Sequence, residues 1–320
     1  MAKIRVAVLR GGPSAEYEIS LMTGRNVLKF LPKDKYHAHD ILISRDCAWH
    51  MDGFPSEPAK IFRKVDAVFN ALHGEYGEDG QVQQILEGHK IPYTGSGILA
   101  SAMAMKKSIA KDVYKKTGLK TPRGLVVKKS ANLKDSARDI NETLFPPWII
   151  KPAGRGSSVG VAIAKDVPEI PSALEKAFLY DDEALAEEFI AGREATCGVL
   201  ENFRGKEYYA LPVIEIIPPD GNFFNYEVKY NGATKEICPA HLDDKISKEI
   251  QEMAVRAHSA LGLRHYSRSD FIISPKGIYI LETNTLPGLT SESLLPKASE
   301  AIGLSFPNLL DHLVSLALTK

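Results

Sequence analysis

Two carboxylates and an amide near the end of the chain could together hold a metal ion. Asp270 lies in one apolar run, and Glu282 and Asn284 lie in the next. Side chains alternate between the faces of a strand, so Glu282 and Asn284 point the same way, and a tight turn at residues 275–277 would bring Asp270 beside them. Hard oxygen donors suit Mg²⁺, which usually binds through one or two carboxylates and substrate phosphates. Solvated strand ends would give the same pattern, so a separate phosphate-binding feature is needed to favour a metal site.

A glycine-rich segment supplies that feature. It begins at Lys151, reads KPAGRGSSVG and directly follows an apolar run that predicts a strand. Glycines let backbone N–H groups wrap around phosphate oxygens, and the lysine adds positive charge. The segment is not a Walker A loop, because no GKS or GKT follows. A simple hairpin would explain the glycines alone, but the lysine and the carboxylate cluster together favour nucleotide binding.

Two further loops leave predicted strands near the N-terminus. The first, LRGGPSAE, ends at Glu16, whose carboxylate could neutralise an ammonium group. It lacks GxGxxG spacing and so does not predict a dinucleotide site; a helix cap built by Ser14 is the structural alternative. The second, NALHGEYGEDG, places His73 at the carboxyl edge of the sheet, where ligands bind in open α/β folds. The other histidines are interpreted as surface or core residues.

The elements that must position these residues follow two patterns. Strands at 4–9 and 67–72 alternate with helices at about 20–30 and 81–87, which predicts a parallel sheet. A helical segment at 98–116 belongs to a second unit that begins near residue 96. Strands then dominate, at 148–151, 160–164, 184–190, 195–200, 209–217, 270–273 and 278–282, with an amphipathic core helix at 243–261. Residues 218–241 fit no element, and a long loop in a compact domain favours a functional role.

Composition narrows the class of protein. A chain of 320 residues that is 44% hydrophobic and 25% charged predicts a globular protein of two or three domains. Forty basic residues balance forty acidic ones, so we expect no nucleic acid partner. Cys47, Cys197 and Cys238 lack CxxC spacing and predict reduced thiols. The first apolar run is too short for a signal peptide, and residues 308–318 are too few to span a bilayer, so we expect a cytoplasmic protein with no membrane partner.

Taken together, six motifs resemble those of the D-alanine–D-alanine ligase family, in the family's order and across essentially the whole chain. They are GGPSAEYEIS from Gly11, ALHGEYGEDG from Ala71, PYTGSG from Pro92, KPAGRGSSVG from Lys151, NYEVKY from Asn225 and LETNTLPGLTSESL from Leu281. The resemblance implies an ATP-grasp fold, α/β and α+β, with three domains. These would be a Rossmann-like substrate domain at 1–95, a central ATP-grasp subdomain at 96–182 and a C-terminal ATP-grasp subdomain with the metal site and a mobile loop at 183–320.

The same resemblance implies the residues that bind nucleotide and metal. ATP would be held between the central and C-terminal subdomains. Its predicted contacts are Lys107, Lys151, Gly156, Ser158, Glu187, Ile190 and Glu194. Two Mg²⁺ ions, which Mn²⁺ could replace, would be bound by Asp270, Glu282 and Asn284.

Roles toward the amino acid substrates also follow from the resemblance. Glu16 would contact the amino group of the first D-alanine, linked by hydrogen bonds to Ser157 and Tyr230, with His73 in the same subsite. Arg268 and the backbone of Gly288 would stabilise the oxyanion. Ser293 and Leu294 would bind the carboxylate of the second D-alanine. Lys229 and Tyr230 lie in the loop that would close the site.

The implied reaction is the ATP-dependent ligation of two D-alanine molecules through D-alanyl phosphate, which supplies peptidoglycan precursors. In the family, Tyr230 is the usual marker of dipeptide-forming enzymes, because relatives that use D-lactate replace it or reshape its loop, so we favour D-alanine as the second substrate. Relatives that use D-lactate or D-serine share the same framework. A non-catalytic ATP-binding regulator on the same fold is the alternative from another class, although no metal ligand is lost. A homodimer is an expectation from the family.

Three positions depart from the commoner forms of the family. Lys106 stands where an acidic residue usually precedes the lysine, Arg155 where the phosphate loop usually has glutamate, and Glu188 where lysine often follows the adenine-contacting glutamate. None of them is a metal ligand. We therefore expect activity with an altered affinity for ATP, which the KM for ATP of an Arg155→Glu variant would measure.

Overall fold

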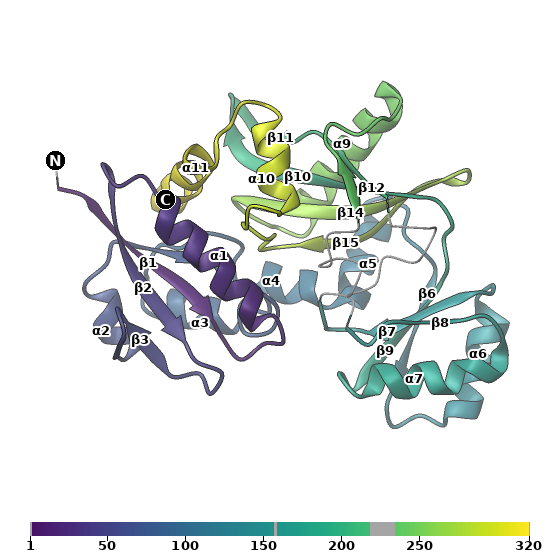
Figure 1. Cartoon of the computed structure of the whole chain (residues 1–320). Coiled ribbons are helices and arrows are strands. Elements are labelled where there is room, and N and C mark those ends of the chain that lie inside the picture. The colour runs from purple at the N-terminus through teal and green to yellow at the C-terminus, as the bar shows by residue number, and fades with distance from the viewer. Residues whose placement is uncertain (1, 157–158, 218–233, 320) are drawn as a thin grey trace.

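The computed structural model describes residues 2–156, 159–217 and 234–319 of the chain. The strands of these residues form sheets of five, four and six strands. Figure 1 shows the five-stranded sheet beside the N-terminus, the four-stranded sheet at the opposite end of the molecule, and the six-stranded sheet above and between them. Within the described part of the chain, no helix is long and apolar enough to cross a membrane.

The first sheet has the βαβ pattern predicted for the start of the chain. In sheet order its strands are β4 (Phe54–Pro55), β3 (Trp49–Met51), β2 (Tyr36–Ile43), β1 (Ile4–Gly11) and β5 (Ala67–Asn70). β1 runs parallel to β2 and β5, and its residues 6–9 are buried on both faces. The helices of this unit are α1 (Tyr17–Phe30), α2 (Pro58–Phe62) and α3 (Gln81–Gly88). Because β1 and β5 are neighbours, the loops after them, which carry Glu16 and His73, leave the same edge of the sheet.

The second sheet is antiparallel and has helices on one face. Its strands in order are β6 (Gly124–Lys128), β9 (Glu183–Glu188), β7 (Trp148–Pro152) and β8 (Ala162–Ala164). α6 (Leu133–Thr143), the short η1 (Val167–Glu169) and α7 (Ile170–Phe178) lie beside it. Trp148 and Ile150 are buried against these helices, so the alternation of the strand directs Ile149 and Lys151 to the other face. The glycine-rich segment connects β7 to β8.

The third sheet carries the predicted metal-binding hairpin. Its strands in order are β13 (Lys235–Ile237), β12 (Ile214–Ile217), β10 (Arg193–Phe203), β14 (Tyr266–Ser274) and β15 (Gly277–Asn284), and β11 (Lys206–Ala210) pairs with β10. Its core includes residues of α4 (Ile98–Met105), α5 (Lys107–Lys116) and α9 (Asp244–Ala260). The predicted apolar stripe of α9 is confirmed, since Ile250, Met253 and Ala257 are buried in this core.

Two predicted elements are interrupted. The helix expected at 98–116 is divided at Lys106, whose backbone is extended, and the N–H of Lys107 donates to the carbonyl of Ala153 at 3.0 Å. The break therefore joins α5 to the start of the glycine-rich segment. The strand expected at 209–217 is divided into β11 and β12 around Pro212, which has no N–H to donate to a ladder.

The C-terminal helices return to the first sheet. α10 (Leu294–Glu300) is followed by α11 (Phe306–Leu318), which lies beside α1 in Figure 1. Leu309 and Leu313 of α11 share one buried cluster with Val27 and Phe69. Asp311 accepts a hydrogen bond from the Tyr36 hydroxyl at 2.7 Å. α11 thus fastens the end of the chain to the sheet that carries Glu16 and His73.

A buried histidine joins the first unit to the third and should make stability depend on pH. His265 has φ +69°, and its Nδ1 accepts from the Gly95 N–H at 3.0 Å. Burial, and then the charge of Arg264, lower the pKa of His265 to about 4. The unfolded chain therefore binds more protons between pH 6.5 and 4, so this residue's contribution to stability is lost as the pH falls through that window.

Asparagine at position 265 should remove this dependence. It tolerates positive φ and can still accept from Gly95. Between pH 7 and pH 5 the unfolding free energy of the wild type should fall by about 2 kcal/mol relative to His265→Asn, measured by urea denaturation at both pH values. If the unfolding free energies of the two proteins fell equally between pH 7 and pH 5, His265 would not titrate in this way.

Candidate active site

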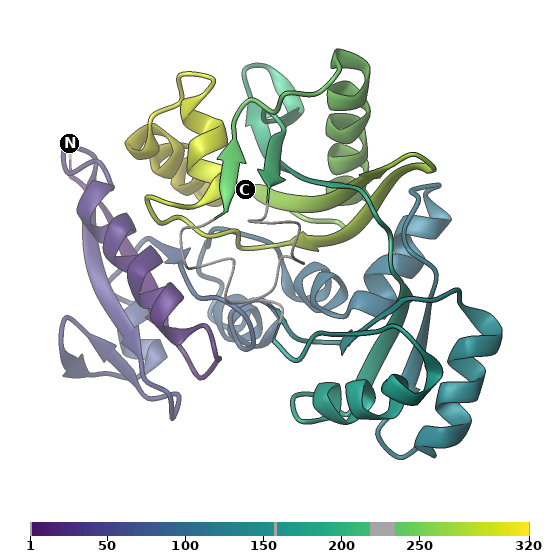
Figure 2. The ribbon, with the colours of Figure 1, turned by 45° about the vertical axis from the view of Figure 1, so that its right-hand side comes forward.

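One cavity of about 1050 Å³ lies where the three sheets meet. Figure 2 shows the three units arranged around a common centre. Every predicted site residue that the structure describes lines this cavity. These residues are Glu16, His73, Lys107, Lys151, Gly156, Glu187, Ile190, Glu194, Arg268, Asp270, Glu282, Asn284, Gly288, Ser293 and Leu294. The other four, Ser157, Ser158, Lys229 and Tyr230, lie outside the described residues.

The predicted hairpin brings its polar residues together. Asp270 pairs with Glu282 across β14 and β15, and Arg268 pairs with Asn284. The Asn284 amide nitrogen lies 3.4 Å from Asp270 Oδ2, and Thr196 Oγ1 donates to Asp270 Oδ1 at 2.6 Å. The predicted convergence is therefore confirmed, but strand alternation alone does not produce it. A shift in register just after Asp270, which the sequence did not indicate, pairs Asp270 with Glu282 in place of Leu281.

This donor set fits a hard cation that also binds phosphate. Arg268 reaches Asp270 through Nε at 3.1 Å and Nη2 at 3.2 Å, so the carboxylate is already held in place. Among the described residues there is no group of three or more His, Cys, Asp or Glu that could hold a metal by itself. Two carboxylates and an amide would thus need further oxygens from water or a polyphosphate, which is the usual state of protein-bound Mg²⁺.

Lysines and Glu187 form a buried ionic cluster beside this hairpin. Lys151 Nζ lies 2.6 Å from Glu187 Oε2, and Lys111 Nζ pairs with the other carboxylate oxygen. Burial raises the pKa of Glu187, but Lys111 and Lys151 outweigh it and the net shift is downward. Lys107 Nζ lies 3.4 Å from Glu282 Oε2 and so links this cluster to the metal-binding candidates. The group can hold a polyanion and order its phosphates.

Lys111 is absent from the residues predicted from the sequence. It is almost fully buried, and its Nζ also donates to Thr121 Oγ1 at 2.6 Å. Burial lowers its pKa to about 8. The sequence does contain a pattern that could have indicated the burial of Lys111. Lys107, Ala110, Lys111 and Tyr114 recur at helical spacing and form the buried stripe of α5. A lysine in such a stripe needs a buried partner, which Glu187 provides.

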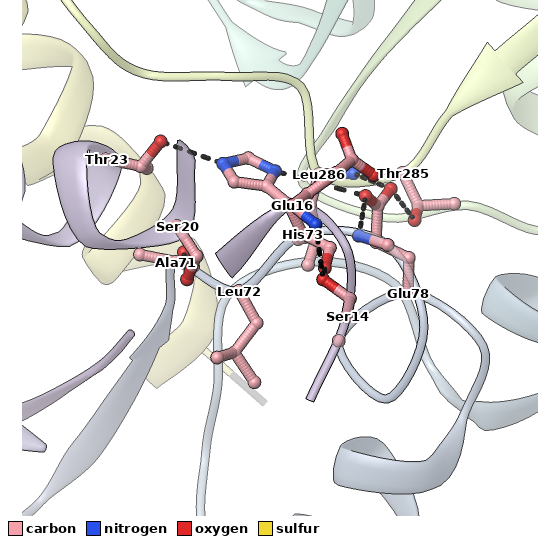
Figure 3. A network of polar contacts seen from close by, with 12 residues as sticks. Ser14, Glu16, Ser20, Thr23, Ala71, Leu72, His73, Glu78, Thr285 and Leu286 are labelled. Carbon is pink, nitrogen blue, oxygen red and sulfur yellow. Dashed lines mark hydrogen bonds and ion pairs between the residues drawn. The ribbon is translucent and has the colours of Figure 1, made fainter. Parts of the chain in front are cut away.

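The loops after β1 and β5 form the opposite wall of the cavity. A Cβ added at Gly156 would lie 3.1 Å from Glu16 Oε2, so the glycine-rich segment passes close to this carboxylate. The Ser14 hydroxyl donates to the carbonyl of His73 at 2.6 Å; Ser14 is not the cap of α1, whose N-cap residue is Glu16. His73 is buried, with Nε2 2.8 Å from Thr23 Oγ1 (Figure 3). Burial lowers the pKa of His73, so a neutral ring is favoured.

The three departures from the commoner motifs all have ionic partners. Lys106 Nζ lies 2.7 Å from Glu183 Oε2, and Arg123 Nη1 lies 3.5 Å from Glu188 Oε1. The Arg155 guanidinium forms an ion pair with Glu75, and its Nε donates to the carbonyl of Tyr180 at 2.6 Å. Arg155 therefore ties the glycine-rich segment to the loop that carries His73.

Arg155→Glu should raise the KM for ATP by about tenfold with little change in kcat. The substitution places a negative charge in the glycine-rich segment and opposite Glu75, and one lost favourable contact of this kind changes affinity by about that factor. Adding Glu75→Arg should recover part of the loss by restoring the ion pair. Arg138→Glu, on the exposed face of α6, is the matched control. An unchanged KM in Arg155→Glu would remove Arg155 from nucleotide binding.

Two antiparallel sheets, one carrying Lys151 and Glu187 and the other Asp270, Glu282 and Asn284, face one cavity next to a Rossmann-like sheet. This is the ATP-grasp fold, as predicted. Models for the D-ala D-ala ligase N-terminus match residues 5–61 and 50–96, and the model for the D-ala D-ala ligase C-terminus matches residues 113–315. The chain belongs to the D-alanine–D-alanine ligase family.

Individual relatives agree with this assignment. The chain is 42% identical over 318 residues to a D-alanine–D-alanine ligase of Syntrophobacter fumaroxidans, covering 99% of this chain and 98% of that protein. The structure of the VanG D-Ala:D-Ser ligase from Enterococcus faecalis superimposes with a TM-score of 0.86 at 34% identity, over 99% of this chain and 100% of that one. The D-alanine–D-alanine ligase from Coxiella burnetii gives 0.85 at 28% identity, over 99% and 94%. The family depends on ATP and a divalent metal ion.

Proposed function

We propose that this chain is an ADP-forming ligase that joins two D-alanine molecules into D-alanyl-D-alanine through D-alanyl phosphate. The observation that carries the proposal is one cavity, which gathers the Glu16 carboxylate, a lysine cluster and a carboxylate hairpin from three different units of the fold. The relatives named above, similar over nearly the full chain, support the choice of substrate.

The proposed chemistry explains why these groups must meet. A carboxylate resists attack by an amine until one of its oxygens becomes a leaving group, and transfer of the γ-phosphoryl group of ATP achieves this. Lys107 and Lys151 would hold the phosphates, together with Gly156 and Ser158. Glu187, Ile190 and Glu194 would hold the adenosine. Each contact is proposed from the family's motifs and from the position of the described residues on the cavity.

The two amino acids would bind next to each other, so that the second amine can reach the acyl carbon of the first. Glu16 would hold the first ammonium group, with Ser157, Tyr230 and His73 around it. Arg268 and the Gly288 N–H would stabilise the oxyanion that forms when the second amine attacks. Ser293 and Leu294 would seat the second carboxylate, and Lys229 with Tyr230 would close the site against water, which would otherwise hydrolyse the acyl phosphate.

Asp270, Glu282 and Asn284 would hold two Mg²⁺ ions, which Mn²⁺ could replace. When bound, these ions neutralise charge on the polyphosphate and the transferring phosphoryl group. We further propose domains at 1–95, 96–182 and 183–320, a homodimer, and a place in the cytoplasm, where peptidoglycan precursors are made. Light scattering should then give about twice the 35.2 kDa of one chain.

A second candidate is a ligase that takes D-serine or D-lactate as the second substrate. The likeness to the D-Ala:D-Ser ligase from Enterococcus faecalis favours considering it. The two readings share the same first half-reaction and differ only at the subsite of the second amino acid. Product masses therefore separate them.

The test is ATP-dependent phosphate release by the purified chain with Mg²⁺. D-alanine alone, L-alanine alone, and D-alanine mixed with D-serine or D-lactate are compared, and the products are identified by mass spectrometry. We expect phosphate release and D-alanyl-D-alanine from D-alanine alone and from the mixtures, and no release with L-alanine. If no D-amino acid caused phosphate release although ATP bound measurably, a non-catalytic regulator would be favoured.

A further inference from the structure

Glu78 ties together two loops that belong to different sheets. Its Oε1 accepts from the Gly74 N–H at 2.9 Å, in the loop of His73. Its Oε2 accepts from Thr285 Oγ1 and from the Leu286 N–H, both at 3.1 Å, in the loop after β15 (Figure 3). Hydrogen bonds to an ionised carboxylate are stronger than those between neutral groups, so one side chain makes a firm link between segments 207 or more residues apart.

The loop after β15 has a second tie to the same part of the molecule. Asn26 of α1 donates its side-chain N–H to the carbonyl of Leu289 at 3.3 Å. Leu286 and Leu289 are thus both bonded to the N-terminal unit, and Gly288 lies between them. A Cβ at Gly288 would come within 2.8 Å of Ser293 Oγ, so the backbone here is also closely packed against the start of α10.

The surroundings of Glu78 indicate that its charge state matters for this link. Burial, and then the neighbouring Glu16 carboxylate, raise the pKa of Glu78 to about 7. The ionised carboxylate can accept from all three donors, whereas a protonated one must turn an O–H toward one of them. A bound ammonium group beside Glu16 would offset the repulsion between the two carboxylates and favour the ionised form.

We propose that Glu78 is a positioning residue, which holds the backbone N–H of Gly288 at a fixed place relative to the Glu16 and His73 subsite. The inference rests on the proposed ligase function, in which the first amino acid binds at that subsite and Gly288 meets the oxyanion. Donors that stabilise a developing charge must already be in place when the charge forms, and a misplacement of about 1 Å can cost a hundredfold in rate. By its hydrogen bonds to both loops, Glu78 fixes the distance between the loop after β5 and the loop after β15.

Glu78→Gln tests the proposal with the least change in shape. The amide has only one acceptor oxygen, so either Gly74 or the Leu286 loop loses its partner. We expect kcat for dipeptide formation to fall by about 10- to 100-fold, and the KM for ATP to stay within about twofold, because Glu78 does not contact the lysines of the nucleotide site. Asn26→Ala removes the longer hydrogen bond between neutral groups, and it should lower kcat by less than about tenfold. Glu87→Gln, in which Glu87 of α3 accepts from the Tyr93 hydroxyl, is the control and should leave kcat unchanged.

Two further measurements separate positioning from a general loss of stability. Thr285→Val removes one donor to Glu78, so a double variant with Glu78→Gln should be no slower than Glu78→Gln alone. Hydrogen exchange of peptides covering 285–291 should be faster in Glu78→Gln than in the wild type, and this readout needs no catalysis. If the wild-type protein had no activity with D-alanine, the proposed function would be wrong. The hydrogen-exchange measurement would still test whether Glu78 holds the loop at 285–291 in place. Unchanged kcat, unchanged exchange at 285–291 or additive losses in the double variant would overturn the role of Glu78.

Discussion

Asp270→Asn should lower kcat for dipeptide formation by about a thousandfold and leave the fold intact. Asparagine has the same shape and keeps one oxygen for the hydrogen bonds from Thr196 and Arg268. It lacks the negative charge that a hard cation and a neighbouring guanidinium both need. Loss of one preorganised electrostatic group typically costs a hundredfold to a thousandfold, and loss of a metal ligand belongs at the upper end. The measurement is kcat at saturating ATP, D-alanine and Mg²⁺.

The matched control is Asp66→Asn. Asp66 is bonded to Arg5 on the surface and does not line the cavity, so its removal should leave kcat unchanged. Urea unfolding of both variants shows whether either has lost stability. If Asp270→Asn kept more than about a tenth of the wild-type kcat, the hairpin would not be the metal site.

Glu187→Gln should be among the most destabilising single substitutions in the cavity, at about 4 kcal/mol. Glu187 is buried between Lys111 and Lys151, and an amide would take the paired carboxylate from both ammonium groups. Removal of one partner from a buried ionic group typically costs about 3–5 kcal/mol. Lys111→Met should cost about half as much, because the Lys151–Glu187 pair survives it and methionine has a similar volume.

The test compares the unfolding free energies of the two variants, measured in urea without nucleotide. The account predicts the larger loss for Glu187→Gln. The double variant, with both substitutions, should be more stable than Glu187→Gln alone, since one unpaired buried charge is removed. A larger loss in Lys111→Met than in Glu187→Gln would contradict the account. It would mean that the contacts of Lys111 with Thr121 and Pro122 outweigh the ionic balance of the cluster.

The hairpin of Asp270, Glu282 and Asn284 could be predicted from the sequence because it is local, although its exact register could not. The turn at 275–277 brings β14 beside β15, but its register alone would pair Asp270 with Leu281, on the face opposite Glu282. The register shift between Asp270 and Phe271 pairs Asp270 with Glu282 instead, and Asp270, Glu282 and Asn284 then lie on one side. The helix at 98–116, at the start of the second unit, could be predicted in extent but not in continuity. Its break at Lys106 is accompanied by the hydrogen bond from Lys107 to Ala153, a contact 46 residues away along the chain.

Buried charges could not be predicted from composition or spacing alone. Lys111 and Glu78 each stand among other charged residues, in KKSIAKDVYKK and GEYGEDG. The helical spacing of Lys111 with Ala110 and Tyr114 indicates a buried face but not its partner, and GEYGEDG has no comparable pattern. Their burial depends on remote elements: β9 supplies Glu187 to one, and the loop after β15 supplies Thr285 and Leu286 to the other. The ion pairs of Lys106, Arg155 and Glu188 are equally remote. Their roles in nucleotide binding remain predictions.

The most direct test of the central claim follows one oxygen atom. The chain is supplied with ATP, Mg²⁺ and D-alanine labelled with ¹⁸O in its carboxylate, and the released phosphate is examined by mass spectrometry. If the carboxylate oxygen attacks the γ-phosphorus and ADP leaves, that oxygen departs with the phosphate when the second amine attacks the carbonyl carbon. The account predicts one ¹⁸O in each phosphate released with dipeptide. Unlabelled phosphate accompanying the formation of D-alanyl-D-alanine would show that the carboxylate is not activated by phosphorylation.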